Sequence, residues 1–473
     1  MSTEQRATRR GFFNRLIDGV HGAALASLLT ADRARAAGQY DLTPKKPHFE
    51  PKAKAVIHLF MNGGPSQVDL FDPKPALKKF AGTAPSRDIV NQIEFADQIG
   101  VMMPSPFQFK RYGQCGMEMT ELMPHLGSVC DDVAFIRSMY GEHFNHEPSI
   151  YLMQSGRTLP GRPSLGAWVT YGLGSVNQNL PAYVVLDDPK GLPINLTQNW
   201  QSGWLPPIYQ GTRFRSEGLP LLNLKPPDDL PSPLVEAQRE LLRVLDESHR
   251  IERRGVGDLD ARIASYELAA RMQLSATDAL DLAQETEATR EMYGLNEEAT
   301  RSYGRRCLMA RRLVERGVRF VQIFIEGQIW DNHSNLEKDL KYCCNKTDKP
   351  AAALIRDLKQ RGLLDSTLIL WGGEFGRMPI SQLRQGGTAG RDHGPGGFTT
   401  WMAGGGVKGG TIHGATDEIG HKAVEDRVSV HDFHATMLHL LGLRFRDLTY
   451  VRHSLPERLT DQYPARVVSE ILV

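Results

Sequence analysis

Residues 53–65 read AKAVIHLFMNGGP, and this stretch decides the fold. Residues 53–61 are almost continuously apolar, which is typical of a strand buried on both faces of a parallel sheet. Asn62-Gly63-Gly64-Pro65 then ends the strand, because glycine and proline interrupt regular structure. Similar short apolar runs predict further strands at residues 132–139, 182–186, 318–325, 366–371 and 398–403.

Helical patterns lie between these strands, at residues 303–315, 351–361 and 434–441. Gly362 and Gly442 follow the last two, as is common where helices end. Alternating strands and helices predict an α/β fold of three layers with a mainly parallel central sheet. Residues 229–300 are charged and helix-rich, and we interpret them as a helical insertion in a domain that spans residues 54–473.

Composition excludes several classes of protein. The 473 residues carry 56 basic and 55 acidic side chains with 41% hydrophobic residues, so the chain is not of the disordered type. The balanced charge argues against a nucleic-acid partner. No apolar run approaches the ~20 residues of a transmembrane helix. The five cysteines show no CxxC spacing and are expected to be small buried side chains, not a disulfide framework.

Residues 1–37 have the pattern of an export signal. Thr8-Arg9-Arg10-Gly11-Phe12-Phe13 is a twin-arginine motif, a mildly apolar stretch follows at residues 22–31, and Ala34-Arg35-Ala36 offers a cleavage site. The sequence therefore predicts the twin-arginine export machinery as a partner and a periplasmic or extracellular location. Residues 38–53, rich in proline and lysine, are interpreted as a linker.

Polar clusters occur where the predicted strands end. Ligands of open α/β sheets bind beyond the carboxyl ends of the strands, so these clusters are expected to share one edge. Imidazole with carboxylate suits Zn, Mn or Fe, whereas oxygen ligands alone suit Ca or Mg. The clusters are residues 62–69, 143–149, 330–333 and 372–377, together with 390–394 just before the last strand.

Nine segments of the chain resemble one family. They are NGGPSQVDLFDPKP, NHEPS, RPSLGAWVTYGLGS, LPAYVVL, RRLVERGVRFVQI, WDNHSN, GGEFGRMP, GRDHGPGGFTTWMAGGG and HDFHATMLHLLGL. By these segments the chain is identified as a member of the "domain of unknown function 1501" family of exported, sulfatase-like proteins. The segments extend from about residue 55 to the end of the chain.

A wider resemblance is to the alkaline phosphatase superfamily of sulfatases, phosphodiesterases and phosphomutases. It implies that superfamily's fold and a divalent ion, Zn, Mn or Ca. The implied metal ligands are Asn62, with Asp69 as a further candidate, then Asp331, His333, Glu374 and His393. The run from His146 through Ser149 to Arg157 is similar to the sulfatase pattern around its modified cysteine, which makes these three residues the catalytic candidates.

The chain departs from the superfamily at four points. Asn62 replaces the usual first aspartate, and Phe375 stands where a histidine is common. Asp331 and His333 have the spacing D-x-H instead of D-x-x-x-H, and the expected nucleophile is absent at its aligned position. The attacking group is then either a water activated by the metal or His146, since imidazole can serve as nucleophile or acid–base group.

These observations lead to one main function and two alternatives. The main prediction is an exported, metal-dependent hydrolase of sulfate or phosphate esters, carried by a small molecule or a glycan. The first alternative is a catalytically silent sulfatase-like protein that binds such ligands or acts as a scaffold of the cell envelope. A redox protein using the adjacent Cys343 and Cys344 is the weaker alternative, because no partner motif surrounds them.

Overall fold

The computed structural model describes residues 42–91, 98–217, 231–253, 257–382 and 387–473. The chain divides into a large unit, Leu42–Lys225 with Leu268–Val473, and a small one, Met1–Asp41 with Pro226–Glu267. The predicted signal peptide, 1–37, lies outside the described residues, as do residues 38–41 of the predicted linker. The described part of the small unit consists of α9 (Ser232–Glu252) and the start of α10 (Gly257–Leu280).

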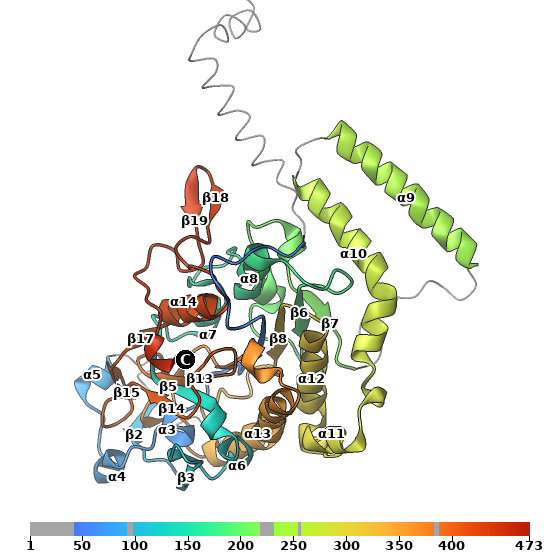
Figure 1. Cartoon of the computed structure of the whole chain (residues 1–473). Coiled ribbons are helices and arrows are strands. Elements are labelled where there is room, and N and C mark those ends of the chain that lie inside the picture. Colours follow the sequence, from blue (N-terminus) through green and yellow to red (C-terminus); the bar gives the residue numbers. More distant parts are fainter. Residues whose placement is uncertain (1–41, 92–97, 218–230, 254–256, 383–386) are drawn as a thin grey trace, which may run out of the picture. The chain divides into compact units, whose positions relative to one another are not determined.

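A nine-stranded sheet forms the centre of the large unit (Figure 1). The strands that correspond to the predicted runs at residues 53–61, 182–186, 318–325, 366–371 and 398–403 are buried along their whole length. The strands, in their order across the sheet, are β14 (Thr411–His413), β5 (Val133–Tyr140), β13 (Phe398–Ala403), β9 (Thr367–Gly372), β1 (Ala55–Phe60), β8 (Phe320–Phe324), β6 (Tyr183–Leu186) and β7 (Thr212–Phe214), while β17 (Val428–Ser429) also pairs with β5.

The direction of the strands determines which loops meet. The pairs β1–β8, β1–β9, β6–β8, β6–β7, β5–β14 and β5–β17 are all parallel. Strand β13 runs antiparallel to both β5 and β9. The segment before β13 therefore reaches the same edge of the sheet as the segments after β1, β5, β8 and β9.

Helices cover both faces of the sheet. Figure 1 shows α7 (His146–Ser155), α8 (Leu165–Leu173) and α14 (Val430–Leu440) on one side, with α12 (Glu298–Glu315) and α13 (Leu336–Gln360) on the other. Helix α8 packs on β6 and β8, and α12 packs on β1 and β8. The predicted three-layer, mainly parallel α/β fold is confirmed. No helix within the described residues is long and apolar enough to cross a membrane.

Helix α13 begins 15 residues before the segment that the sequence predicts. Pro350 lies inside this helix, where a proline usually marks a boundary. The residues before it, including Leu340, Cys343 and Cys344, are buried and hold the first half of the helix against the rest of the unit.

Short elements complete the structure. The predicted insertion, 229–300, contains α9, α10, α11 (Glu287–Met292) and the start of α12. The other short helices are α3 (Gln67–Leu70), α4 (Ala76–Phe80), α5 (Arg87–Val90) and α6 (Pro124–Gly127). The small strand pairs are β2 (Ile99–Met102) with β11 (Ile380–Gln382), β3 (Phe109–Tyr112) with β4 (Met117–Thr120), β10 (Gly376–Arg377) with β12 (His393–Gly394), β15 (Ala415–Thr416) with β16 (Ala423–Glu425), and β18 (Tyr450–Arg452) with β19 (Leu455–Glu457).

Candidate metal centre

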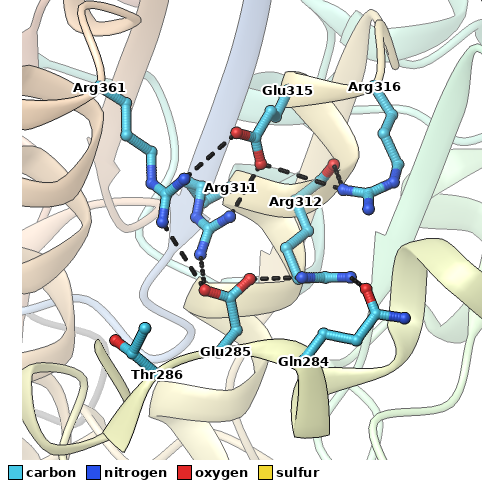
Figure 2. A pocket seen from close by; sticks show the side chains of 8 residues that line it. All are labelled: Gln284, Glu285, Thr286, Arg311, Arg312, Glu315, Arg316 and Arg361. Atoms are coloured by element: carbon cyan, nitrogen blue, oxygen red, sulfur yellow. Dashed lines mark hydrogen bonds and ion pairs between the residues drawn. The ribbon is translucent and has the colours of Figure 1, made fainter. Parts of the chain in front are cut away.

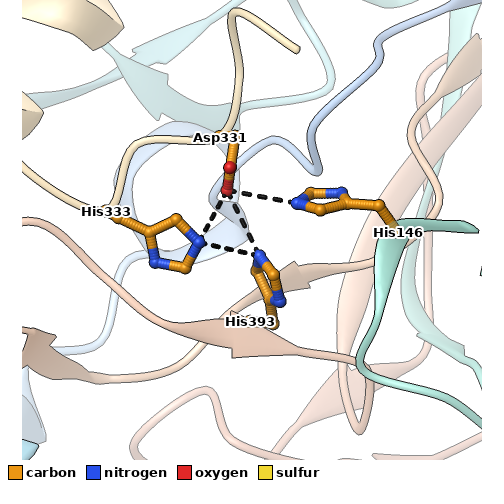
Figure 3. Close-up of side chains that lie close together, drawn as sticks. All are labelled: His146, Asp331, His333 and His393. Atoms are coloured by element: carbon orange, nitrogen blue, oxygen red, sulfur yellow. Dashed lines mark hydrogen bonds and ion pairs between the residues drawn. The ribbon is translucent and has the colours of Figure 1, made fainter. Parts of the chain in front are cut away.

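Three histidines and one aspartate meet at the carboxyl edge of the sheet (Figure 3). His146 is the first residue of α7, after β5, and Asp331 and His333 follow β8. His393 lies in β12, before β13. Each of the four side chains offers one ligand atom, and these atoms all lie within 4.8 Å of one another.

Asp331 is the centre of this cluster. Its Oδ1 atom lies 2.9 Å from His333 Nε2, 3.2 Å from His393 Nε2 and 3.3 Å from His146 Nε2. The two atoms His333 Nε2 and His393 Nε2 are only 2.9 Å apart. Figure 3 shows the three imidazoles converging on this one carboxylate. The Asp331 side chain remains 24% exposed, so the cluster is open to small solutes.

Two of the imidazoles are held in place by a hydrogen bond at Nδ1, the ring nitrogen that faces away from Asp331. His146 Nδ1 lies 2.7 Å from Glu374 Oε1, and because a carboxylate only accepts, this ring nitrogen is the donor. His333 Nδ1 makes the equivalent contact with the side-chain oxygen of Gln382. In their neutral forms both rings then turn an Nε2 lone pair toward Asp331 Oδ1. Two acceptors this close repel each other unless a cation or a proton lies between them.

The pKa values of the side chains in the cluster are shifted by burial and by their close contacts. Burial lowers the pKa of His146, but its hydrogen bonds with Asp331 and Glu374 outweigh burial and raise the pKa to about 9. Burial lowers the pKa of His393 to about 3. For Asp331, burial acts to raise the pKa, yet Arg377 and the three histidines outweigh it and hold the pKa far below its usual range. The metal-free protein thus keeps Asp331 ionised beside a protonated His146.

This donor set fits a transition-metal ion. Three imidazoles and a carboxylate suit Zn²⁺ or Mn²⁺, whereas Ca²⁺ takes six to eight oxygen ligands. Metal-bound histidines usually donate their other ring N–H to a carboxylate or carbonyl group, and His146 and His333 both do so here. Zinc–ligand distances of about 2.0–2.1 Å put tetrahedral ligands about 3.3 Å apart, close to the 2.9–3.3 Å contacts around Asp331.

Arg377 fixes the loops that form the cluster. Its Nη2 atom lies 2.7 Å from Asp331 Oδ1 and 3.1 Å from the Trp330 carbonyl oxygen, and its Nε donates to the Gly64 carbonyl at 2.9 Å. The ladder between β10 and β12 pairs Arg377 with His393. A single buried guanidinium therefore ties the segments after β1, β8 and β9 together.

The glycine pair after β1 is required by close approach. Gly63 has a φ of +108°, and a Cβ there would lie 2.6 Å from the Asp331 backbone nitrogen. Gly64 has a φ of +77°, and its Cβ would lie 2.6 Å from the Phe375 ring. That ring packs against His146 and His393, with centroids 4.9 and 4.6 Å away. Phe375 thus presents an apolar ring to both imidazoles, at a position where the sequence resemblance implied a histidine.

The two other predicted metal ligands lie beside the cluster. Glu374 is completely buried and accepts from the Gly63 backbone nitrogen at 2.9 Å as well as from His146. Asn62 donates to the carbonyl oxygens of Gly327, at 2.8 Å, and Ile325. Glu374 Oε2 and Asn62 Oδ1 are buried and have no hydrogen-bond partner among the described residues.

Asp69 is held in a separate ion pair. Its carboxylate accepts from Arg391 at 2.6 and 3.0 Å and from Ser66 Oγ at 2.5 Å. Both side chains of the Asp69–Arg391 pair are fully buried. Asp69 therefore stabilises the loop after β1 and does not join the histidines.

The other catalytic candidates also have partners elsewhere. Ser149 is buried, and its hydroxyl donates to the His143 carbonyl at 2.7 Å. Arg157 bonds Asp461 at 2.5 Å and the Tyr463 hydroxyl at 3.1 Å. Of the three candidates from the sulfatase-like run, only His146 belongs to the cluster.

Sequence reasoning missed Gln382. This residue ends β11, a three-residue strand paired with β2, and it is buried next to His333. An isolated glutamine in a polar loop carries no signal of such a role. Its side-chain nitrogen donates to Gln98 at 3.1 Å, which leaves its oxygen facing His333.

A second charged cluster lies away from this edge (Figure 2). It surrounds a cavity of about 580 Å³ between η5 (Leu282–Gln284), α12 and α13. Arg311, Arg312 and Arg361 all form ion pairs with Glu285. Because these guanidinium groups already have acidic partners, we interpret the cluster as a structural ion network.

The fold and the cluster together define an α/β protein with a candidate metal centre at the carboxyl edge of its sheet. The chain belongs to the DUF1501 family: the model described as "Protein of unknown function (DUF1501)" matches residues 53–472. The family predicted from the sequence is thereby confirmed. No curated protein matches the chain.

Several solved structures are similar to the chain. The FucS1 sulfatase from Pseudoalteromonas sp. has a TM-score of 0.34 and 12% identity, over 87% of this chain and 72% of that one. Ps i-CgsB in complex with k-i-k-neocarrahexaose has a TM-score of 0.34 and 11% identity, over 84% and 72%. A mutant TAB5 alkaline phosphatase with Mg bound in its M3 site has a TM-score of 0.31 and 12% identity, over 78% and 96%. They include a sulfatase and an alkaline phosphatase, the types that the sequence resemblance implied.

Proposed function

We propose that this protein is a metal-dependent hydrolase of sulfate or phosphate esters. One observation carries the proposal: Glu374 and Gln382 bind the Nδ1 atoms of His146 and His333, so that both rings present Nε2 to Asp331. His146, Asp331, His333 and His393 would hold the ion. The donor set favours Zn²⁺ or Mn²⁺ over Ca²⁺.

The chemistry of these esters supports a metal. Hydrolysis of the slowest phosphate and sulfate esters needs an acceleration of ~10¹⁷-fold or more. The amino end of α7, where His146 lies, offers an anion only about 0.3–1 kcal/mol. A divalent ion held by the four side chains would supply Lewis acidity, and a water taken up as its fifth ligand would have its pKa lowered to about 7.

The protein's own residues have separate tasks in this proposal. Glu374 and Gln382 hold the His146 and His333 rings in the orientation that presents Nε2. Arg377 keeps Asp331 ionised and fixes its loop. Phe375 excludes water from one side of the His146 and His393 rings. The exposed part of Asp331 marks the side from which an ester would approach.

Metal analysis combined with an ester screen tests the proposal. The purified protein is loaded with Zn²⁺ or Mn²⁺, desalted, and tested on aryl sulfates and on aryl phosphate mono- and diesters. We expect about one tightly held ion per chain and hydrolysis of one ester class. The variant His333→Ala should lose both, whereas His439→Ala, which removes a partly exposed histidine on α14, should keep both.

The alternative is a catalytically silent protein that binds ligands or acts as a scaffold. Two serine hydroxyls near the carboxyl ends of β1 and β5 favour it: Ser66 donates to the Asp69 carboxylate, and Ser149, on α7, donates to the His143 carbonyl oxygen. Both serines are buried and neither belongs to the histidine–aspartate cluster, so neither is placed as the nucleophile that the sequence resemblance would imply. Absence of bound metal after loading, with no hydrolysis in the screen, would support this alternative and refute the enzyme.

We also propose export through the twin-arginine route to the periplasm or beyond. The support is the Arg9-Arg10 pair, the apolar stretch at residues 22–31 and the Ala34-Arg35-Ala36 site. Residues 1–41 fused to a reporter that is active only after export should direct it out of the cytoplasm. Replacing both Arg9 and Arg10 by Lys should abolish that export, and export that persists would contradict the proposal.

A further inference from the structure

Two cysteines far from the histidine cluster lie in contact. Cys115 is in the turn between β3 and β4, and Cys130 begins the short helix η2 (Cys130–Asp132), just before β5. Their Sγ atoms are 3.7 Å apart. The other three cysteines, Cys307, Cys343 and Cys344, are buried.

Asp131 holds the two cysteines together. Its carboxylate accepts from the backbone nitrogens of Gln114, at 2.9 Å, and Cys115, at 2.8 Å. These bonds hold the turn against η2. Gly113 makes the approach possible, since a Cβ at that position would lie 2.5 Å from Cys130 Sγ.

The turn has room to adjust. Gly116, the residue after Cys115, has a φ of +68° and open space around its Cβ direction. Cys115 is partly exposed, whereas Cys130 is fully buried. A reagent can therefore reach Cys115 directly, and Cys130 only through it.

A metal is the other chemistry that two thiols and a carboxylate suggest. The ligand atoms of Cys115, Cys130 and Asp131 do lie within 4.8 Å of one another. Both Asp131 oxygens, however, already accept backbone N–H groups. The pair of thiols left over falls short of the four ligands of a structural zinc site.

We infer that Cys115 and Cys130 form a disulfide when the protein meets a disulfide-bearing oxidant such as oxidised glutathione. The Cys115 thiol loses its proton to solvent, and its sulfur attacks one oxidant sulfur. The sulfur–sulfur bond of the oxidant breaks, a mixed disulfide forms, and the leaving thiolate takes up a proton from solvent to become the first thiol. Cys130 sulfur then attacks Cys115 sulfur, the second thiol leaves, and the Cys130 proton passes to that leaving group. One disulfide is reduced to two thiols for each protein disulfide formed.

The order of these steps follows from burial. Burial raises the pKa of Cys130 to about 12, so the more exposed Cys115 reacts first. The closed loop joins the β3–β4 turn to the start of β5, whose other end leads into His146. The inference goes beyond the proposed hydrolase and does not depend on it.

Mass spectrometry of the whole chain tests this inference. The reduced protein is treated with oxidised glutathione, alkylated and digested. Trypsin leaves both cysteines in one peptide, Tyr112–Arg137, which should be lighter by two hydrogen atoms and unlabelled. A second cut after Glu118 or Glu121 separates the cysteines, and the fragments should stay linked until a reductant is added.

Thiol counting and unfolding give independent readouts. Alkylation after denaturation should label three cysteines in the oxidised protein and five in the reduced one. Closing a loop across 15 residues should raise the unfolding midpoint by about 3 °C. In Cys115→Ser the oxidant should change neither the label count nor the unfolding midpoint. Cys130→Ser should stop at the mixed disulfide of glutathione with Cys115, which removes one label but closes no loop and leaves the midpoint without that rise.

Three results would overturn the inference. The first is five labelled cysteines after treatment with the oxidant. The second is a stable adduct of one glutathione on Cys115. The third is a stoichiometric metal ion that protects both thiols from alkylation and is lost in Cys115→Ser. The peptide map of the natural chain decides among these outcomes even if a serine variant fails to fold.

Discussion

Replacing Glu374 with glutamine isolates the role of the carboxylate behind His146. Glu374 Oε1 accepts from His146 Nδ1 at 2.7 Å and from Gly63 N at 2.9 Å, and the side chain is completely buried. Glutamine keeps the shape and one oxygen that can accept both bonds. It removes only the negative charge, so the fold around the glycine pair should remain.

The expected effect is a weaker metal site. A hydrogen bond to a charged partner contributes about 1.5–3 kcal/mol, against about 0.5–1.5 kcal/mol for a neutral one. The loss of about 1.4 kcal/mol at His146 corresponds to a tenfold lower affinity for Zn²⁺. That value falls within the range of about 10–100-fold that such outer-sphere changes produce.

Competition with a coloured chelator measures this affinity for the natural chain and for Glu374→Gln. Glu326→Gln is the matched control, because Glu326 is also a buried glutamate after a central strand but bonds Tyr342 and Lys346 instead. An affinity of Glu374→Gln within twofold of the natural chain would refute the proposed orientation of His146. An equal loss in Glu326→Gln would show that the effect is a general loss of structure.

Three further changes have defined outcomes. Asp331→Asn removes the anion shared by the three histidines, so we expect metal binding to be more than about 100-fold weaker. Elemental analysis after metal loading measures this, and one ion per chain in the variant would contradict the site. Asp69→Asn leaves the fully buried Arg391 without its partner and should lower the free energy of unfolding in denaturant by about 3–5 kcal/mol; a loss below about 1 kcal/mol would be inconsistent with that pair. Burial lowers the pKa of His434 to about 3, so between pH 6.5 and pH 3 the unfolded chain binds a proton that the folded chain does not, and stability falls with falling pH. His434→Gln can still donate to the Met153 carbonyl and should reduce that slope by about 1.4 kcal/mol per pH unit near pH 5, and an unchanged slope would mean that His434 is not buried in its neutral form.

The long elements were predictable because burial leaves a pattern in the sequence. Strand β1 is buried at every position, and all of its residues except His58 are apolar, so the apolar run showed this burial directly. The two-residue strands β10 and β12 leave no such pattern. They form because loops after β9 and before β13 meet at one edge, and their pairing places Arg377 next to His393.

The site was predictable only as far as topology determines it. Parallel strands end at one edge, so the sequence could place Asp331 and His333 beside the loops that follow the other strands. His393 reaches the same edge because it precedes β13, which runs antiparallel to its neighbours. The role of Glu374 could not be predicted in this way. Its position after β9 was visible in the sequence, but only the structure shows that it lies close enough to His146 to accept a hydrogen bond from the imidazole. Gln382 could not be found at all, since its role depends on a short strand that pairs with a distant segment.

The charge balance of the cluster links it to anionic esters. Without a metal, the protonated His146 and Arg377 balance the carboxylates of Asp331 and Glu374, so the cluster is close to neutral. A divalent ion bound as proposed would displace one proton from His146 and would leave the cluster one charge more positive. Because the cluster is largely buried, this excess charge is poorly screened. In the proposed enzyme the groups that hold the ion would thus leave a net positive field on the exposed side of Asp331, and this field would favour a sulfate or phosphate ester over a neutral one.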